Sequence, residues 1–119
     1  MIDTERKTEI KDEDDLDDGG YPTEYALDKI KNWDMLDFPG CMEYVFKLWH
    51  WEDYRWSEEA KDEYFDHPIT RYYLSTGGWS GNESIIGAMQ ENQMLWFFNW
   101  VQSRRGGHYI FEHRKEKTK

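Results

Sequence analysis

The chain has little of what stabilises or anchors many small proteins. It contains one cysteine and three prolines in 119 residues, and no apolar run long enough to cross a bilayer. A single cysteine excludes a disulfide within the chain and a zinc site built from several cysteines. Cys41 lies among Met42, Val45 and Phe46, so we expect a buried structural thiol rather than a nucleophile. Residues 1–10 lack the basic start and apolar core of a signal peptide, and we therefore expect a cytoplasmic protein without membrane contact.

Small aliphatic side chains are also scarce, whereas aromatic ones are abundant. Hydrophobic residues make up 38% of the chain, and seven tryptophans, eight tyrosines and six phenylalanines supply almost half of them. This length holds one domain with one core, so that core must consist largely of rings. The rings predicted to be in the core are Trp33, Phe46, Trp49, Trp96, Phe98 and Trp100. The rings beside acids or glycines, expected at contacts with a partner, are Trp51, Tyr54, Trp56 and Trp79.

Positive charge is scarce over most of the chain. The net charge is −10; residues 1–20 hold nine acidic against three basic residues, whereas residues 104–119 hold two acidic against six basic ones. This pattern predicts an acidic flexible arm at 1–20, a single folded domain at 21–113 and a basic tail at 114–119. The negative body disfavours direct binding to nucleic-acid phosphates and favours a basic protein surface as the partner.

The hydrophobic spacing predicts an α+β fold with a helical N-terminal half. Thr23 is suited to cap a first helix, and the Asp37 turn precedes a second. We expect a third helix over 57–66, because Ser57 precedes two glutamates and Pro68 follows the segment.

The second half of the chain predicts the order β-α-β-β in a small antiparallel sheet. Residues 69–74 are β-branched and aromatic, which indicates a strand. Ser80 and Glu83 have the spacing of a capping box at the start of a helix. Residues 94–101 are almost all apolar and rich in aromatic rings, so we expect a central strand there. A hairpin turn at 104–107 then leads into its partner strand.

An acidic stretch forms the densest charge in the predicted domain. The acids that share one exposed face of the predicted helix over 57–66 are Glu59, Asp62, Glu63 and Asp66. Such a row is either a solvated helix face or a rigid mimic of phosphates, offered to the nucleic-acid channel of another protein. In the second interpretation, the neighbouring rings from Trp51 to Trp56 supply anchors.

Two glycine-rich segments are candidate ligand sites. Residues 77–82 join a strand to a helix, where free amides can hold an anion. They lack the Lys-Ser/Thr pair of a phosphate loop and the dinucleotide fingerprint, and a tight turn with Trp79 packed over it is the alternative. Arg104 and Arg105 precede two glycines at the predicted hairpin tip. At this position their guanidinium groups can bind a phosphate or carboxylate through two hydrogen bonds. Alternatively, they keep an exposed turn soluble or pair with the acidic helices.

The sequence shows no pattern typical of catalysis. His108 and Glu112 share one face of the last predicted strand, but two residues do not define a metal site. There is no nucleophile elbow, no His-Glu-x-x-His motif and no cysteine–histidine spacing typical of a nucleophile. We therefore expect a protein without catalytic residues, metal or cofactor.

The region from Arg71 to Glu112 resembles a known group of proteins. The blocks GGWSGNE and RRGGHY, within RYYLSTGGWSGNESIIGAMQEN and WFFNWVQSRRGGHYIFE, are similar to those of small proteins of unassigned role encoded by bacteriophages and prophages. The resemblance implies a phage origin and brings no established activity. By analogy of size and charge with inhibitors of host defence, it suggests an anti-CRISPR-like protein or a nuclease inhibitor.

Three functions follow from these patterns. The first is a non-enzymatic protein that binds the basic surface of a host nucleic-acid-handling complex, such as a CRISPR–Cas effector or nuclease, and blocks it. The second is a small nucleotide- or nucleic-acid-binding module that uses the glycine-rich loop with Arg104 and Arg105. The third is a structural phage component that forms homo-oligomers through aromatic patches.

Overall fold

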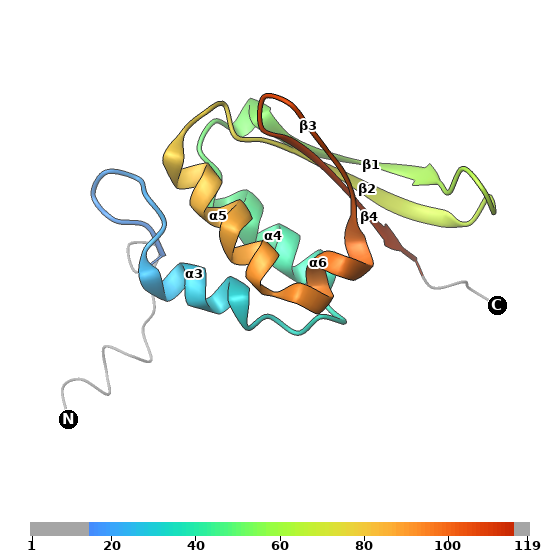
Figure 1. Cartoon of the computed structure of the whole chain (residues 1–119), viewed down its shortest axis with the longest axis horizontal. Helices are drawn as coiled ribbons and strands as arrows, with labels where there is room; N and C mark the ends of the chain where they lie inside the picture. The colour runs from blue at the N-terminus through green and yellow to red at the C-terminus, as the bar shows by residue number, and fades with distance from the viewer. Residues whose placement is uncertain (1–14, 116–119) are drawn as a thin grey trace.

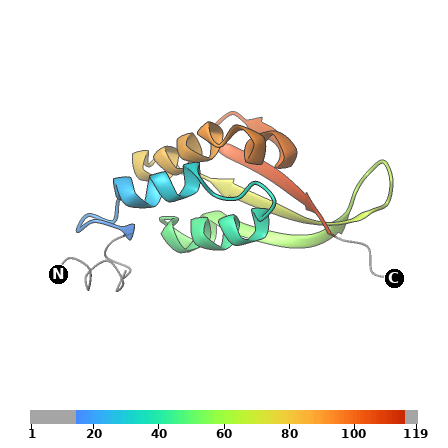
Figure 2. The same cartoon turned by 90° about the horizontal axis from the view of Figure 1, so that it is seen from below.

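The computed structural model describes residues 15–115, which form an α+β fold of two layers (Figure 1). In chain order its elements are α3 (Glu24–Lys31), α4 (Phe38–Leu48), the short 3-10 helix η1 (Glu52–Tyr54), β1 (Arg55–Lys61), β2 (Pro68–Ser75), α5 (Ser80–Glu91), α6 (Gln93–Asn99), β3 (Trp100–Arg104) and β4 (His108–Arg114). The four strands form one antiparallel sheet in the order β1-β2-β4-β3. The α-helices gather on one face of this sheet, and the hairpin of β1 and β2 projects beyond them (Figures 1 and 2).

The core lies between the helices and the covered face of the sheet. Phe38 of α4 meets Tyr72 of β2 edge to face at 5.5 Å between ring centroids, and Phe111 of β4 at 5.7 Å. Tyr72 and Phe111 are directly opposite each other in the β2–β4 register. Cys41 is fully buried beside this cluster, as expected for a structural thiol. Burial raises the pKa of the Cys41 thiol to about 12.

The two predicted N-terminal helices are confirmed, together with their start signals. The hydroxyl of Thr23 accepts a hydrogen bond from the amide of Ala26 at the first turn of α3. Asp37 accepts one from the amide of Gly40 at the start of α4, and Pro39 occupies the first turn, where a missing N–H costs nothing.

The helix predicted over 57–66 is wrong, because residues 55–61 form the edge strand β1. All seven residues of β1 have partners on β2, from Arg55 opposite Leu74 to Lys61 opposite Pro68. This strand pairing overrides the local helical signals. Charged side chains suit an exposed edge strand because they discourage pairing with another chain.

The strand predicted over 94–101 is wrong for most of its length. Residues 93–99 form α6, and β3 begins only at Trp100. Asn92 sets this geometry: its side-chain amide donates to the carbonyls of Ile30 and Trp33 and so fixes the corner between α5 and α6. The second half of the chain therefore has the order β-β-α-α-β-β, and the sheet has one strand more than predicted.

The predicted core rings divide into three groups. Trp49 is buried, whereas Trp33, Phe46 and Trp96 are partly buried against the core. Phe98 and Trp100 are exposed, so their assignment to the core is wrong. The cause is the short helix α6, which buries only Leu95 and Asn99.

The capping box predicted at Ser80 does not form, whereas the predicted hairpin at 104–107 does. Trp79 is the N-cap of α5, Ser80 is already helical, and no side chain caps the helix. The strands β3 and β4 are joined by the expected turn, in which Gly106 and Gly107 have φ values of +97° and +83°.

Residues 15–20 of the predicted acidic arm belong to the described part of the chain. Residues 1–14 lie outside the described part, as do residues 116–119 of the predicted basic tail. Leu16 forms an isolated β-bridge with Pro22, and the carbonyl of Asp15 accepts a hydrogen bond from the amide of Thr23. The packed structure therefore already includes residue 15, six positions before the predicted boundary.

Candidate functional site

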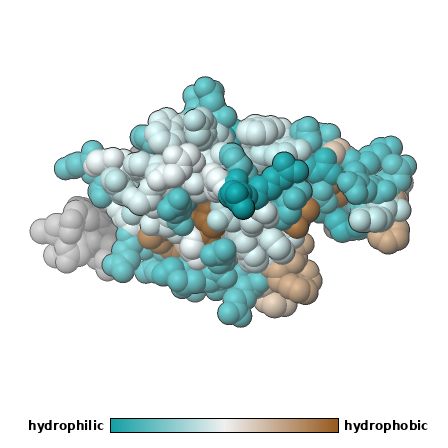
Figure 3. Space-filling model, turned by 45° about the horizontal axis from the view of Figure 1, so that its top comes forward, coloured by the Kyte–Doolittle hydropathy of each residue, from teal (hydrophilic) through white to brown (hydrophobic). Residues whose placement is uncertain are grey.

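The loop at 62–67, which joins β1 to β2, carries the most exposed aromatic rings of the described chain. Tyr64 is 84% exposed and Phe65 is 76% exposed. The loop lies at the far end of the projecting hairpin (Figure 1). In Figure 3, hydrophobic colours reach the surface as separate spots on a largely hydrophilic face. We call residues 62–67 the hairpin tip.

One carboxylate holds the backbone of the hairpin tip. Oδ1 of Asp62 accepts hydrogen bonds from the amides of Tyr64 at 2.7 Å and Phe65 at 3.3 Å. The main chain of Asp62 also bonds to Asp66 and His67, and Asp66 has a φ of +58°. The amide hydrogen bonds, together with the Arg114 guanidinium, hold the pKa of Asp62 below its usual value. The tip is thus a fixed turn that presents two neighbouring rings.

The predicted acidic row is not a row on a helix. Glu59 lies on β1 and pairs with Lys115, which lowers the pKa of the Glu59 carboxyl mainly by a hydrogen bond. Asp62 pairs with Arg114 at 3.0 Å, and Asp66 lies 3.9 Å from Lys61. Glu63 is exposed, without an ion pair within residues 15–115. The interpretation as a phosphate mimic along a rigid helix is therefore wrong, because Glu59 lies on a strand, the other three acids lie in a turn, and three of the four acids have a basic partner.

Three of the four predicted contact rings lie in the region around η1 and the Gly77 loop, at the other end of β2 from the tip. Their centroid distances form a chain: Tyr21–Trp79 4.5 Å, Trp79–His50 4.3 Å, His50–Trp51 4.6 Å and Trp51–Tyr54 5.3 Å. Trp79 has Tyr21 and His50 as ring neighbours, and Trp51 and Tyr54 pack on Gly77. These rings remain partly exposed, but their contacts with one another are structural.

Asn82 supports this ring cluster, and sequence reasoning missed it. It is fully buried, and its side chain accepts from the amide of His50 at 2.9 Å and donates to the carbonyls of His50 and Thr76. The amide thus joins the end of α4, the end of β2 and the start of α5. Its position in GGWSGNE suggested a capping box, in which it had no role.

The structure brings the glycine-rich loop and the arginine hairpin together. The amide of Thr76 donates to the carbonyl of Gly107 at 2.9 Å, and the hydroxyl of Ser75 lies 2.7 Å from Nδ1 of His108. Arg104 and Arg105 are exposed beside this contact and form no ion pair with any residue of the described range. The suggestion that they pair with acidic helices is therefore not supported by the structure within residues 15–115.

The fourth predicted contact ring, Trp56, lies on the uncovered face of the sheet. It stacks on Tyr73 of β2 with centroids 4.7 Å apart and planes 11° from parallel. The hydroxyl of Tyr73 donates to Glu58 at 2.7 Å. Next to this pair, the Arg71 guanidinium binds Glu112 through two nitrogens, at 2.9 and 2.8 Å. Nothing in the sequence signals these pairs, because they depend on strand register.

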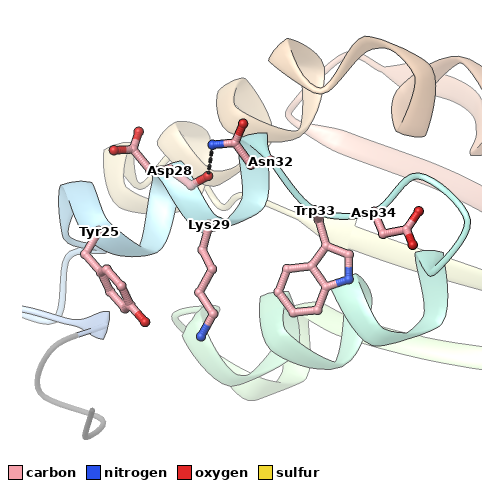
Figure 4. A pocket seen from close by; sticks show the side chains of 6 residues that line it. All are labelled: Tyr25, Asp28, Lys29, Asn32, Trp33 and Asp34. Atoms are coloured by element: carbon pink, nitrogen blue, oxygen red, sulfur yellow. Dashed lines mark hydrogen bonds between the residues drawn. The ribbon is translucent and has the colours of Figure 1, made fainter. Parts of the chain in front are cut away.

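A shallow groove of about 460 Å³ runs along α3 (Figure 4). It is lined by Tyr25, Asp28, Lys29, Asn32, Trp33 and Asp34. The ammonium of Lys29 lies 4.4 Å from the ring centroid of Tyr44 and 5.4 Å from that of Tyr25. The cation is therefore already placed against aromatic faces. The groove brings together no acid–base pair with a nucleophile.

Neither a metal site nor a membrane span is found in the part of the chain that the structure describes. Residues 15–115 contain no group of three or more His, Cys, Asp or Glu side chains placed to hold a metal ion. None of their helices has the length and apolarity needed to cross a bilayer. Comparison of the chain with protein-family models, with curated proteins and with solved structures finds no match.

Proposed function

We propose that this chain is a non-enzymatic binding protein that docks on a basic protein surface through its hairpin tip. The observation that carries the proposal is the exposure of the adjacent rings of Tyr64 and Phe65 on a turn held by Asp62. Exposed aromatic pairs of this kind are typical anchors at protein interfaces, where a few large side chains provide most of the binding energy.

The fixed turn favours binding because it lowers the entropy lost on association. A loop that is already ordered before contact loses little freedom when it docks. Asp62 provides that order through two amide hydrogen bonds. The tip also extends past the helices, where a concave partner can reach it (Figure 2).

The charge of the chain supports a basic partner. Glu63, which has no ion pair within residues 15–115, precedes the two rings, and the whole chain carries a net charge of −10. Such a field speeds encounter with a positive surface and repels nucleic acid. Together with the phage origin that we infer from the sequence of residues 71–112, this favours a nucleic-acid-handling host complex in the bacterial cytoplasm, such as a CRISPR–Cas effector or nuclease, as the blocked partner.

A matched pair of double variants tests the proposal. Tyr64→Ser with Phe65→Ser removes the tip rings, and Phe97→Ser with Phe98→Ser removes another adjacent exposed pair, on α6. Both are compared with the original chain as bait in bacterial lysate, with captured proteins quantified by mass spectrometry at low and high salt. We expect a basic protein to be captured by the original chain and by the α6 variant but not by the tip variant. The amount captured should fall at high salt. Equal capture by all three baits would contradict the proposal.

A second candidate function is a nucleotide- or nucleic-acid-binding module at the opposite end of β2. The hydrogen bond from Thr76 to Gly107 favours it, because it places the glycine-rich loop beside Arg104 and Arg105. Titration with ATP and with single-stranded DNA, monitored by tryptophan fluorescence, tests this function. Binding that is lost on Arg104→Ala with Arg105→Ala, and kept in the tip variant, would favour this candidate over the first.

A further inference from the structure

We propose that two copies of this chain associate through a surface formed by α6 and β3, with the two β3 strands paired antiparallel. This surface, which we call the neutral edge, consists of Met94, Phe97, Phe98, Trp100, Val101 and Gln102. The inference is independent of the hairpin tip, which lies on another part of the molecule (Figure 1).

The first observation is that α6 is apolar on both of its sides. Leu95 faces the core and is fully buried. Met94, Phe97 and Phe98 have the spacing that places side chains on one helix face, and they are 48%, 73% and 58% exposed. A helix that is hydrophobic all round is normally buried in the complete assembly. The outer face of α6 therefore requires a cover.

The second observation is a contrast between the two edges of the sheet. The outer strand β1 carries Arg55, Glu58, Glu59 and Lys61, the charged side chains with which proteins protect an open edge. The other outer strand, β3, has the sequence WVQSR and no charge before its last residue. Its five residues are all exposed, so its outer backbone groups are available to another strand. Only one of the two edges is therefore protected by charged side chains.

The third observation concerns the kind of partner. Residues 92–103 contain no charged side chain, although the chain as a whole carries a net charge of −10. Two copies of an acidic protein repel each other wherever their carboxylates meet. At the neutral edge they can approach without that cost, whereas a basic partner finds no charge there to bind. The pattern thus fits a second copy better than a partner of opposite charge.

Pairing of the two β3 strands about a two-fold axis uses the same surface on both copies, so the assembly stops at a dimer. Two antiparallel β3 strands are related by an axis perpendicular to the sheet, which extends the order β1-β2-β4-β3 into one continuous sheet across both copies. Such an axis keeps the helices of both copies on one face and places the Trp100 end of each β3, where α6 ends, beside the Arg104 end of the other copy. The pairing of β3 with β4 shifts register between Trp100 and Gln102, so Val101 is the extra residue of a β-bulge.

The size of the neutral edge predicts a weak dimer. At roughly 200 Å² per aromatic side chain, the exposed parts of Phe97, Phe98 and Trp100 amount to roughly 350 Å² per copy. A standard interface uses about 800 Å² per partner. Met94, Val101 and the strand backbone supply part of the difference. Association should therefore depend on protein concentration.

Sedimentation velocity of the full chain over a range of concentrations tests the proposal. We expect the apparent mass to rise from that of a monomer towards twice that value, with little dependence on salt. Phe97→Glu and Val101→Lys each place a charge on the neutral edge, and each should keep the protein monomeric at every concentration. Phe65→Glu, at an equally exposed ring on the hairpin tip, should leave dimerisation unchanged.

Two outcomes would overturn the inference. One is a monomer at all concentrations of the original chain; the other is a dimer that persists in both neutral-edge variants. Circular dichroism of each variant confirms that it is folded before its mass is interpreted. Loss of dimerisation in Phe65→Glu alone would move the contact to the hairpin tip and would equally reject the neutral edge. Capture of a basic partner depends on a different pair of rings, so either proposal can fail without the other.

Discussion

The hydroxyl of Tyr44 donates a hydrogen bond to Oδ1 of Asp15, which lies 29 positions earlier in the chain, and both residues are buried. Burial and this hydrogen bond raise the pKa of Tyr44 far above its usual value. The contact fastens the N-terminal segment to α4. Tyr44→Phe leaves a buried carboxylate without this donor, which should lower the free energy of unfolding by about 1–3 kcal/mol.

Urea denaturation measures this loss, and Tyr25→Phe is the control. Tyr25 lies on α3 with its ring partly exposed, so removal of its hydroxyl should change the free energy of unfolding by less than about 0.5 kcal/mol. Equal stability of both variants would show that the Asp15 contact contributes nothing.

Two glycine substitutions should have opposite effects on stability. Gly77 has a φ of +63°, and an added Cβ would lie 2.6 Å from the ring of Trp51, so Gly77→Ala should cost about 1–3 kcal/mol. Gly87 lies inside α5, and an added Cβ would meet nothing within 4 Å beyond its chain neighbours and the backbone of its own helix, so Gly87→Ala should stabilise the protein by about 0.5–1 kcal/mol. Thermal unfolding compares the two variants directly. A stabilising Gly77→Ala would contradict the packing of Trp51 on this loop.

The hairpin tip should lose its order at low pH. The pKa of Asp62 is lower in the folded chain than in the unfolded one, so its ionised carboxylate stabilises the turn fully at pH values above its pKa in the unfolded chain. That contribution is lost as the pH falls through the lower pKa of the folded chain. Amide signals of Tyr64 and Phe65, followed by NMR in an acid titration, should shift together in that range. Asp62→Asn should remove the transition, and a transition that persists in this variant would assign it to another group.

Cys41 should be inert while the protein is folded. Burial raises its pKa to about 12, so almost no thiolate exists at neutral pH and reagents cannot reach the sulfur. A chromogenic disulfide reagent should react with it only at the rate of global unfolding and at once in denaturant. Fast modification of the native protein would show that α4 opens locally.

Local signals predicted the elements that depend on neighbouring residues. Thr23 and Asp37 cap the first two described helices because their side chains reach amides three positions ahead. The turn at 104–107 forms because its glycines accept positive φ values. The burial of Cys41 followed from its apolar neighbours along one helix.

Two segments were assigned wrongly because distant contacts decide their structure. Residues 57–61 have the local signals of a helix, yet their pairing with β2 makes them a strand. Residues 93–99 have the composition of a strand, yet they form α6, and the side chain of Asn92 just before it donates hydrogen bonds to the carbonyls of Ile30 and Trp33, about sixty positions earlier. No local pattern contains these partners.

The sequence predicted part of the candidate site, but it did so from a helix that the structure does not contain. The acids around the tip were predicted as a charged row on a helix, but Tyr64 and Phe65 were not among the rings expected at contacts with a partner. A strand followed by a tight turn places both rings at the far end of the hairpin instead. The turn chemistry of Asp62 is visible in the sequence only once a hairpin is assumed.

The strand order has a consequence for how the chain folds. The outer pairs β1–β2 and β3–β4 are hairpins that close over short loops, whereas β2 and β4 meet only after the intervening α5 and α6 have been bridged. Closing that long segment costs the most chain entropy. Side chains along the β2–β4 seam, such as Tyr72 and Phe111, should therefore govern the folding rate. Substitutions in β1 should instead act mainly on the rate of unfolding.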